Sequence, residues 1–350
     1  MRLHVVCAVL SAVVLQACGG GGDGATPSAA APVTERPAAV APTPIAPAPN
    51  IRPLETPSFN LAASLRCSPG VDNATRTPVL LVHGTALNAR NTFSWNYVPQ
   101  LEKIGFPYCT VDLPQNGMGD IQVASEYVVY AVREMARRSQ QKVQIIGHSQ
   151  GGMVPRWALR FWPDIRAQVD DLVSLSGSHH GTLDAHALCV LPCSPAIWQQ
   201  RDSSAFLAAL NKDFETVPEV AYTSVYTMLD EVVVPNLGTG ASSRLRGTGS
   251  HLVNVATQDV CPLNLADHLL VGTSDAVAYA LAFDAITHDG PADPKRIARS
   301  VCTQLFMPGV DPLGFPFDFL NLGTGVAAAL LSPPKVDREP ELKCYVTGGC

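Results

Sequence analysis

The sequence is short of charge, and its basic residues are fewer than its acidic ones. Lys and Arg total 24 against 30 Asp and Glu, charged residues make up only 15% of the chain, and the formal net charge is −6. A nucleic-acid surface needs clustered positive charge, so this composition argues against nucleic acid as a partner. The chain has no internal repeat, and after its N-terminus no apolar stretch is long and uninterrupted enough to span a bilayer.

The sequence also lacks the paired Cys and His ligands of a typical zinc site. Cys189 and Cys193 have plausible ligand spacing, but no second close pair completes a set of four. The adjacent His179 and His180 point in different directions, and we assign them to a structural loop. We therefore expect no metal and no cofactor, with zinc at the Cys pair as the alternative.

The N-terminus has the pattern of an export segment. After a positively charged start, residues 5–15 are apolar but too few to span a membrane. Residues 15–18, Leu-Gln-Ala-Cys, resemble a bacterial lipobox, in which the cysteine is lipidated. We expect residues 1–17 to be a lipoprotein signal peptide and acyl chains on Cys18 to anchor the protein to a membrane surface, with an ordinary cleavable signal as the alternative. Gly19 favours the outer membrane by resemblance to such lipoproteins.

The export segment is followed by a tether and then by one large domain. Nine of the 29 prolines lie between Pro27 and Pro57. Such Ala-, Pro- and Gly-rich sequence cannot bury a core and favours extended chain, so residues 18–58 are expected to be a tether. Residues 59–350 suit a single catalytic domain with a sizeable core.

Eight cysteines lie beyond the export segment, and an even number in an exported chain predicts disulfides. They are Cys67, Cys109, Cys189, Cys193, Cys261, Cys302, Cys344 and Cys350.

Apolar runs and helical periodicity alternate along the domain. We expect strands at 78–83, 143–147, 169–176, 220–227 and 252–257, and helices at 121–138, 152–162, 203–212 and 276–286. This order predicts the α/β class, with a mainly parallel central sheet and helices on both faces. Ligands of such sheets bind at the carboxyl ends of the strands.

A G-x-S-x-G pentapeptide, Gly147-His148-Ser149-Gln150-Gly151, lies between a predicted strand and a predicted helix. This context is typical of the nucleophile elbow of an α/β-hydrolase fold, whose glycines let neighbouring backbone come close. The elbow exposes the Ser149 hydroxyl, and the N–H of Gln150 then faces the oxyanion that develops. The turn after the first predicted strand supplies Thr85 as a second oxyanion donor, and its hydroxyl adds a further bond.

A nucleophilic serine needs a histidine to take its proton and a carboxylate to orient that histidine. In this fold the acid and then the base follow the serine along the chain. Asp230 follows a late strand and is the preferred acid, with Glu231 as the alternative. His268 follows the last strand and is the preferred base, because His251 precedes that strand and His288 follows a helix.

These motifs together resemble the lipase B family of α/β-hydrolases, that of Candida antarctica and its bacterial relatives, over residues 67–333. The matching stretches are 78–85, 149–152, 198–200, 230–235, 267–268 and 326–331. The resemblance implies Ser149 as nucleophile, Asp230 as acid, His268 as base, and Thr85 with Gln150 as the oxyanion hole. It also implies the disulfides Cys67–Cys109 and Cys261–Cys302 and a C-terminal Cys344–Cys350 pair, with Cys189–Cys193 as an additional pair.

The chain departs from that family at three places. His148 replaces a tryptophan that shapes the alcohol pocket, so alcohol selectivity should differ, and we expect the His148 side chain to point away from the chemistry. Ser178 replaces an acyl-pocket aspartate. Loop 184–205 carries the additional Cys pair and could form a lid or rim. Apolar residues near the C-terminus either line an acyl pocket or pack in the core: Phe315, Phe317, Phe319, Leu320, Val326 and Leu330.

The sequence thus predicts a lipase-like carboxylic-ester hydrolase that works through an acyl-enzyme. An esterase of short esters and a polyester depolymerase share this chemistry, and a catalytically inactive lipid-binding surface protein is the non-enzymatic alternative. The expected partners are an ester or lipid substrate and a membrane surface reached through the anchor. We expect a monomer that is exported, either as a bacterial outer-membrane lipoprotein or as a secreted protein.

Overall fold

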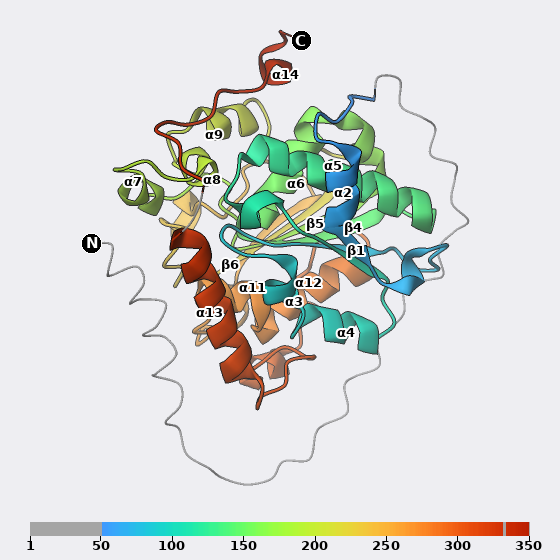
Figure 1. Ribbon diagram of the computed structural model, residues 1–350. Coiled ribbons are helices and arrows are strands. Elements are labelled where there is room, and N and C mark those ends of the chain that lie inside the picture. The colour runs from blue at the N-terminus through green and yellow to red at the C-terminus, as the bar shows by residue number, and fades with distance from the viewer. Residues whose placement is uncertain (1–50, 332–333, 350) are drawn as a thin grey trace.

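The computed structural model describes residues 51–331 and 334–349 (Figure 1). The expected signal peptide, the lipidation site Cys18 and the expected Cys344–Cys350 pair therefore lie wholly or partly outside the described residues. The last part of the expected tether contacts the domain, because Thr56 N–H donates to Glu126 at 2.7 Å and the Arg52 guanidinium lies 4.6 Å from the ring centroid of Tyr345.

A seven-stranded sheet forms the centre of the molecule, in the order β1-β3-β2-β4-β5-β6-β7. Only β1 is antiparallel to its neighbour, and every other pair is parallel. The predicted α/β-hydrolase fold class is confirmed. The strands are β1 Leu65–Cys67, β2 Val79–Val82, β3 Tyr108–Val111, β4 Val143–His148, β5 Val169–Leu175, β6 Ala221–Tyr226 and β7 Leu252–Ala256.

Helices cover both faces of the sheet (Figure 1) because its central strands are apolar on both sides. In β2, Leu80 and Val82 belong to a core shared with helices α5 and α6, whereas Val79 and Leu81 belong to a second core shared with α12. Successive strand residues point to opposite faces, which explains the continuous apolar run at this strand.

The three long helices of the sheet layers agree with the predicted ranges. They are α5 Ile121–Ser139, α6 Gln150–Phe161 and α12 Ala276–Thr287. Aspartates cap two of them, since Asp120 accepts the N–H of Gln122 at 2.9 Å and Asp275 accepts that of Ala278 at 2.7 Å.

The other helices are shorter or lie toward the C-terminus. They are α2 Ser58–Ser64, α3 Ala89–Phe93, α4 Tyr97–Lys103, α7 Asp184–Leu188, α8 Pro195–Gln199, α9 Ala205–Leu210, α10 Thr257–Val260, α11 His268–Thr273, α13 Phe315–Leu331 and α14 Cys344–Thr347.

The segment His268–Thr287, which includes α11 and α12, is long and apolar enough to cross a membrane by length and composition. Its most apolar window is 78% buried inside the protein. Such burial is the property of a core helix, and α12 indeed packs on β5 and β6.

Three disulfides are formed among the described residues, and each pairs cysteines as expected from the sequence. They are Cys67–Cys109, Cys189–Cys193 and Cys261–Cys302. The first joins residues that face each other across β1 and β3, so it fastens the edge strand to the sheet.

The Cys67–Cys109 bridge should stabilise the fold more than the Cys189–Cys193 bridge does. The two bridges join residues separated by 42 and 4 positions, so they restrict the unfolded chain to different degrees. Loop entropy predicts that Cys67→Ala with Cys109→Ala lowers the free energy of unfolding by about 4 kcal/mol, and Cys189→Ala with Cys193→Ala by about 2 kcal/mol. Denaturant unfolding of the two double variants measures this difference, and equal losses would contradict it.

Candidate active site

Ser149 lies in a strained turn between strand β4 and helix α6. Its φ of 56° and ψ of −125° fall outside the regions that ordinary side chains adopt. The flanking glycines make the turn possible, because a Cβ on Gly147 would lie 2.0 Å from the carbonyl oxygen of Gly151 and one on Gly151 would lie 2.1 Å from that of Val82. The sequence from 147 to 151 therefore has the backbone of a nucleophile elbow.

Asp230 and His268 form a buried pair. His268 Nδ1 donates to Asp230 Oδ2 at 3.0 Å. The other oxygen, Oδ1, accepts the backbone N–H groups of Val232 at 3.0 Å and Val233 at 2.7 Å. Burial opposes the charge of the Asp230 carboxylate, but His268 and these N–H groups outweigh it and hold the pKa of Asp230 below its ordinary value. The carboxylate thus stays ionised and oriented.

The same contacts set the protonation behaviour of His268. Because Nδ1 carries the proton donated to Asp230, the other ring nitrogen, Nε2, is left as a proton acceptor. Burial alone lowers the pKa of His268, but the charges of Asp230, Glu231 and Asp267 and the hydrogen bond that the imidazole donates to Asp230 together raise that pKa above 6.5.

Glu231, the alternative acid, occupies a different position. Its carboxylate accepts the backbone N–H of His268 at 3.1 Å and does not contact the imidazole. Burial raises the pKa of Glu231. The structure therefore places Asp230 on the ring of His268 and Glu231 on its backbone.

The alternative bases lie in other surroundings. His251 directly precedes β7, and its Nε2 lies 3.1 Å from Thr216 Oγ1. His288 follows α12 and pairs with Asp284, the two side chains being 3.3 Å apart. Of the three candidate histidines, only His268 is paired with Asp230.

His148 does not point away from the chemistry as the sequence led us to expect. Its ring centroid lies 4.9 Å from that of His268, and its Nε2 donates to the carbonyl of His268 at 3.0 Å. Gly272 makes room for this ring, since a Cβ there would lie 2.0 Å from it. Burial, followed by the charge of His268, lowers the pKa of His148 to about 3, so a neutral ring supports the candidate base.

The turn after β2 lies directly against the serine. A Cβ on Gly84 would be 2.8 Å from Ser149 Cβ and 3.3 Å from its Oγ. Among the described residues the Ser149 hydroxyl has no hydrogen-bond partner, and bonds of this kind are commonly long until substrate binds. Thr85 follows Gly84, and its Oγ1 accepts a bond of 3.1 Å from the side chain of Gln150. The two expected oxyanion donors are thereby brought together beside Ser149.

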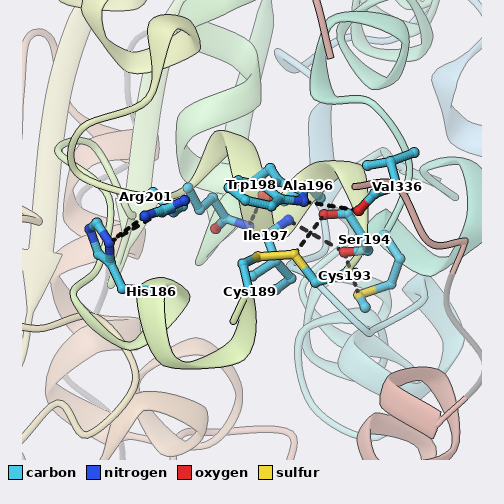
Figure 2. Close-up of a disulfide and its surroundings, with 11 residues drawn as sticks. His186, Cys189, Cys193, Ser194, Ala196, Ile197, Trp198, Arg201 and Val336 are labelled. Carbon is cyan, nitrogen blue, oxygen red and sulfur yellow. Dashed lines mark hydrogen bonds between the residues drawn. A yellow bond between two sulfur atoms is a disulfide. The ribbon is translucent and has the colours of Figure 1, made fainter. Parts of the chain in front are cut away.

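Segment 184–205 contains the two short helices α7 and α8, and the Cys189–Cys193 disulfide closes the loop between them (Figure 2). The disulfide packs in an apolar cluster with Ala86, which follows Thr85, and with Val326 of α13. This cluster connects the segment to the oxyanion turn. Between the two cysteines, Val190 and Leu191 are 76% and 55% exposed, so the loop presents aliphatic side chains to solvent.

Polar contacts hold both ends of this segment. His186 on α7 contacts Asp202 at 2.6 Å. It also accepts a hydrogen bond of 2.7 Å from Arg201 (Figure 2). Cys193 and Val336 exchange two backbone bonds, of 3.2 and 2.8 Å, that attach the C-terminal segment. These contacts and the disulfide attach the segment to the rest of the domain.

Helix α13 contains the apolar residues that were expected either to line an acyl pocket or to pack in the core. Phe319 and Leu322 are buried with Leu87 and with Leu269, the residue after His268. Phe317, in contrast, is 72% exposed.

Within residues 51–331 and 334–349, no group of three or more His, Cys, Asp or Glu residues is arranged to hold a metal ion. Cys189 and Cys193 are joined to each other. His179 is fully buried, and His180 contacts Glu215 at 2.8 Å.

Comparison with known proteins agrees with this geometry. A family model described as palmitoyl protein thioesterase matches residues 78–228. Lipase B of Pseudozyma antarctica is 31% identical over 296 residues, which cover 83% of this chain and 84% of that protein. The crystal structure of Aspergillus fumigatus lipase B superposes with a TM-score of 0.79 at 29% identity, over 92% of this chain and 77% of that chain.

Proposed function

Because the chain belongs to the lipase B family of α/β-hydrolases, we propose that it is a serine hydrolase of carboxylic esters with Ser149, His268 and Asp230 as its catalytic residues. The observation that carries the proposal is the buried His268–Asp230 pair, whose imidazole lies 4.9 Å from the ring of His148, the residue directly before Ser149 in its strained elbow. The pair leaves one imidazole nitrogen free to accept the serine proton.

The proposed reaction has two halves. Ser149 Oγ attacks the ester carbonyl while His268 Nε2 takes its proton, and Asp230 stabilises the imidazolium that forms. The backbone N–H groups of Thr85 and Gln150 donate hydrogen bonds to the carbonyl oxygen and stabilise the negative charge that develops on it. His268 then returns the proton to the leaving alcohol, and a water molecule, activated by the same imidazole, releases the carboxylic acid from Ser149.

The pH dependence of activity should report the protonation of His268. The base acts only when its imidazole is neutral, and its surroundings raise its pKa above 6.5. We therefore expect kcat/KM for a soluble ester to fall tenfold per pH unit on the acid side, with a midpoint above 6.5. A pH titration of the initial rate measures this midpoint, and activity that stays constant down to about pH 4 would contradict the assignment of a histidine base.

The lipase-like reading is the leading proposal for the substrate, by similarity to the two lipase B proteins. The thioesterase family model favours fatty acyl thioesters as a second candidate, since the same serine can attack a thioester carbonyl. Tributyrin, a long-chain triglyceride emulsion, an aliphatic polyester film and palmitoyl-CoA separate the possibilities. Turnover confined to short soluble esters would contradict the lipase-like reading.

We also propose that the protein is monomeric and exported, either as a bacterial outer-membrane lipoprotein anchored at Cys18 or as a secreted protein. The lipobox-like sequence 15–18 supports lipidation, and the three disulfides support folding in an oxidising compartment. Residues 1–17 would be removed. The part of the expected tether 18–58 that precedes residue 51 would hold the catalytic domain away from the membrane, since Arg52 and Thr56 contact the domain. The intact mass of the mature protein tests this, because an unmodified N-terminus at another residue would contradict lipidation.

A further inference from the structure

The hydroxyl of Thr85 lies at the centre of a hydrogen-bond network that joins distant parts of the chain. Its Oγ1 accepts an N–H from Gln150 Nε2 at 3.1 Å and another from Gln200 Nε2 at 2.9 Å. Gln150 begins helix α6, and Gln200 directly follows α8. A hydroxyl oxygen has two acceptor lone pairs and one proton. Both acceptor positions of Thr85 are therefore filled, and only its proton remains to be donated.

Backbone carbonyl groups determine which way the two amides point. Gln150 Nε2 also donates to the carbonyl of Gly117 at 2.9 Å, and Gln200 Nε2 also donates to that of Ala196 at 3.1 Å. A carbonyl oxygen only accepts, so turning either amide over would place two oxygens against each other. Thr85 Oγ1 thus faces an N–H group of each glutamine.

Ser178 holds the other end of Gln200. Its hydroxyl donates to Gln200 Oε1 at 2.9 Å, and the two residues are only 1% and 6% exposed. A buried polar group that loses its partner is costly, so this bond keeps the Gln200 amide in one orientation.

The Thr85 proton has no acceptor in the protein. Thr85 is partly exposed and, among the residues that the structure describes, its hydroxyl donates to none. Its neighbour Gly84 lies against Ser149. The Thr85 hydroxyl therefore keeps a proton that it can donate, and it belongs to the residue that follows the close contact between Gly84 and Ser149.

We propose that Gln200, held by Ser178, is a positioning residue for the oxyanion hole. Together with Gln150 it fills the acceptor positions of Thr85 and directs the Thr85 O–H proton toward the developing oxyanion. This inference rests on the proposed ester hydrolysis. A donor that is already oriented needs no rearrangement when the charge forms, and such preorganised donors account for much of the rate in acyl transfer.

Gln200→Glu tests the proposal most sharply. The new carboxylate accepts hydrogen bonds where the amide donated one, so it takes the Thr85 proton away from the substrate. We expect kcat to fall about 10- to 100-fold with little change in KM. This loss is smaller than the one that follows complete removal of an oxyanion donor, which is about 100- to 1,000-fold. Gln200→Met, which has similar length and no hydrogen bond, and Ser178→Ala, which frees the amide, should each lower kcat only a few-fold.

The same substitutions in a Thr85→Val background separate positioning from general damage. Val removes the hydroxyl, so each double variant should have the same kcat as Thr85→Val alone. Thermal unfolding should show that every variant is folded. Losses that add fully to that of Thr85→Val, or losses confined to KM, would overturn the positioning role while leaving ester hydrolysis intact. Absence of ester turnover in the wild-type protein would instead overturn the proposed function, and the positioning role with it.

Discussion

Ser149→Ala should lower the turnover of p-nitrophenyl butyrate by about a millionfold, because loss of the nucleophile in a serine hydrolase removes the acyl-enzyme route altogether. The only hydrolysis left would be that which the oxyanion donors promote with water as the nucleophile. Initial rates with purified wild-type and variant protein measure the effect.

The fold should survive this substitution, since an alanine removes only one oxygen from the elbow. Equal unfolding midpoints of the two proteins are the required control. If the folded Ser149→Ala variant kept more than about a hundredth of the wild-type rate, Ser149 would be ruled out as the nucleophile, because covalent catalysis contributes far more than that factor.

Asp230→Asn should lower kcat by about ten-thousandfold through a change in the histidine tautomer. Asp230 Oδ1 accepts the N–H groups of Val232 and Val233, so an asparagine would keep its oxygen there and turn its NH₂ group toward His268. That NH₂ donates to Nδ1 of the imidazole and forces the proton onto Nε2. His268 then has no lone pair for the serine proton.

Glu231→Gln is the matched control for this experiment. Its side chain accepts the backbone N–H of His268, and a glutamine oxygen can accept the same bond. We expect a loss of no more than about tenfold, because one hydrogen bond to a backbone group is worth about 1 kcal/mol. If Glu231→Gln slowed the enzyme more than Asp230→Asn, the acid would have to be reassigned.

The parts of the fold that were predictable are those set by local pattern. The continuous apolar run at β2 and the helical periodicity of α5 identify buried elements without tertiary information. Strands β1 and β3 were missed because they have only three and four residues and contain partly exposed positions. Helices α7 and α8, of five residues each, are likewise too short to show a period.

Contacts between distant residues mark the limit of prediction at the site. The contact of His148 with His268 is possible because residue 272 is a glycine, and a Cβ there would overlap the His148 ring. Only the folded chain brings Gly272 beside His148. The network of Ser178, Gln200, Thr85 and Gln150 joins separate segments of the chain. The local sequence around each of these residues gives no sign of the network. Their common role depends on the position at which the segments converge.

Covalent labelling can show whether His268 activates the Ser149 hydroxyl. A fluorophosphonate probe reacts with an activated serine, and peptide mass mapping locates the adduct. We expect a single adduct on Ser149 that forms readily at pH 8 and is lost in a His268→Ala variant. An adduct on another residue, or an unlabelled protein that still hydrolyses esters, would contradict it.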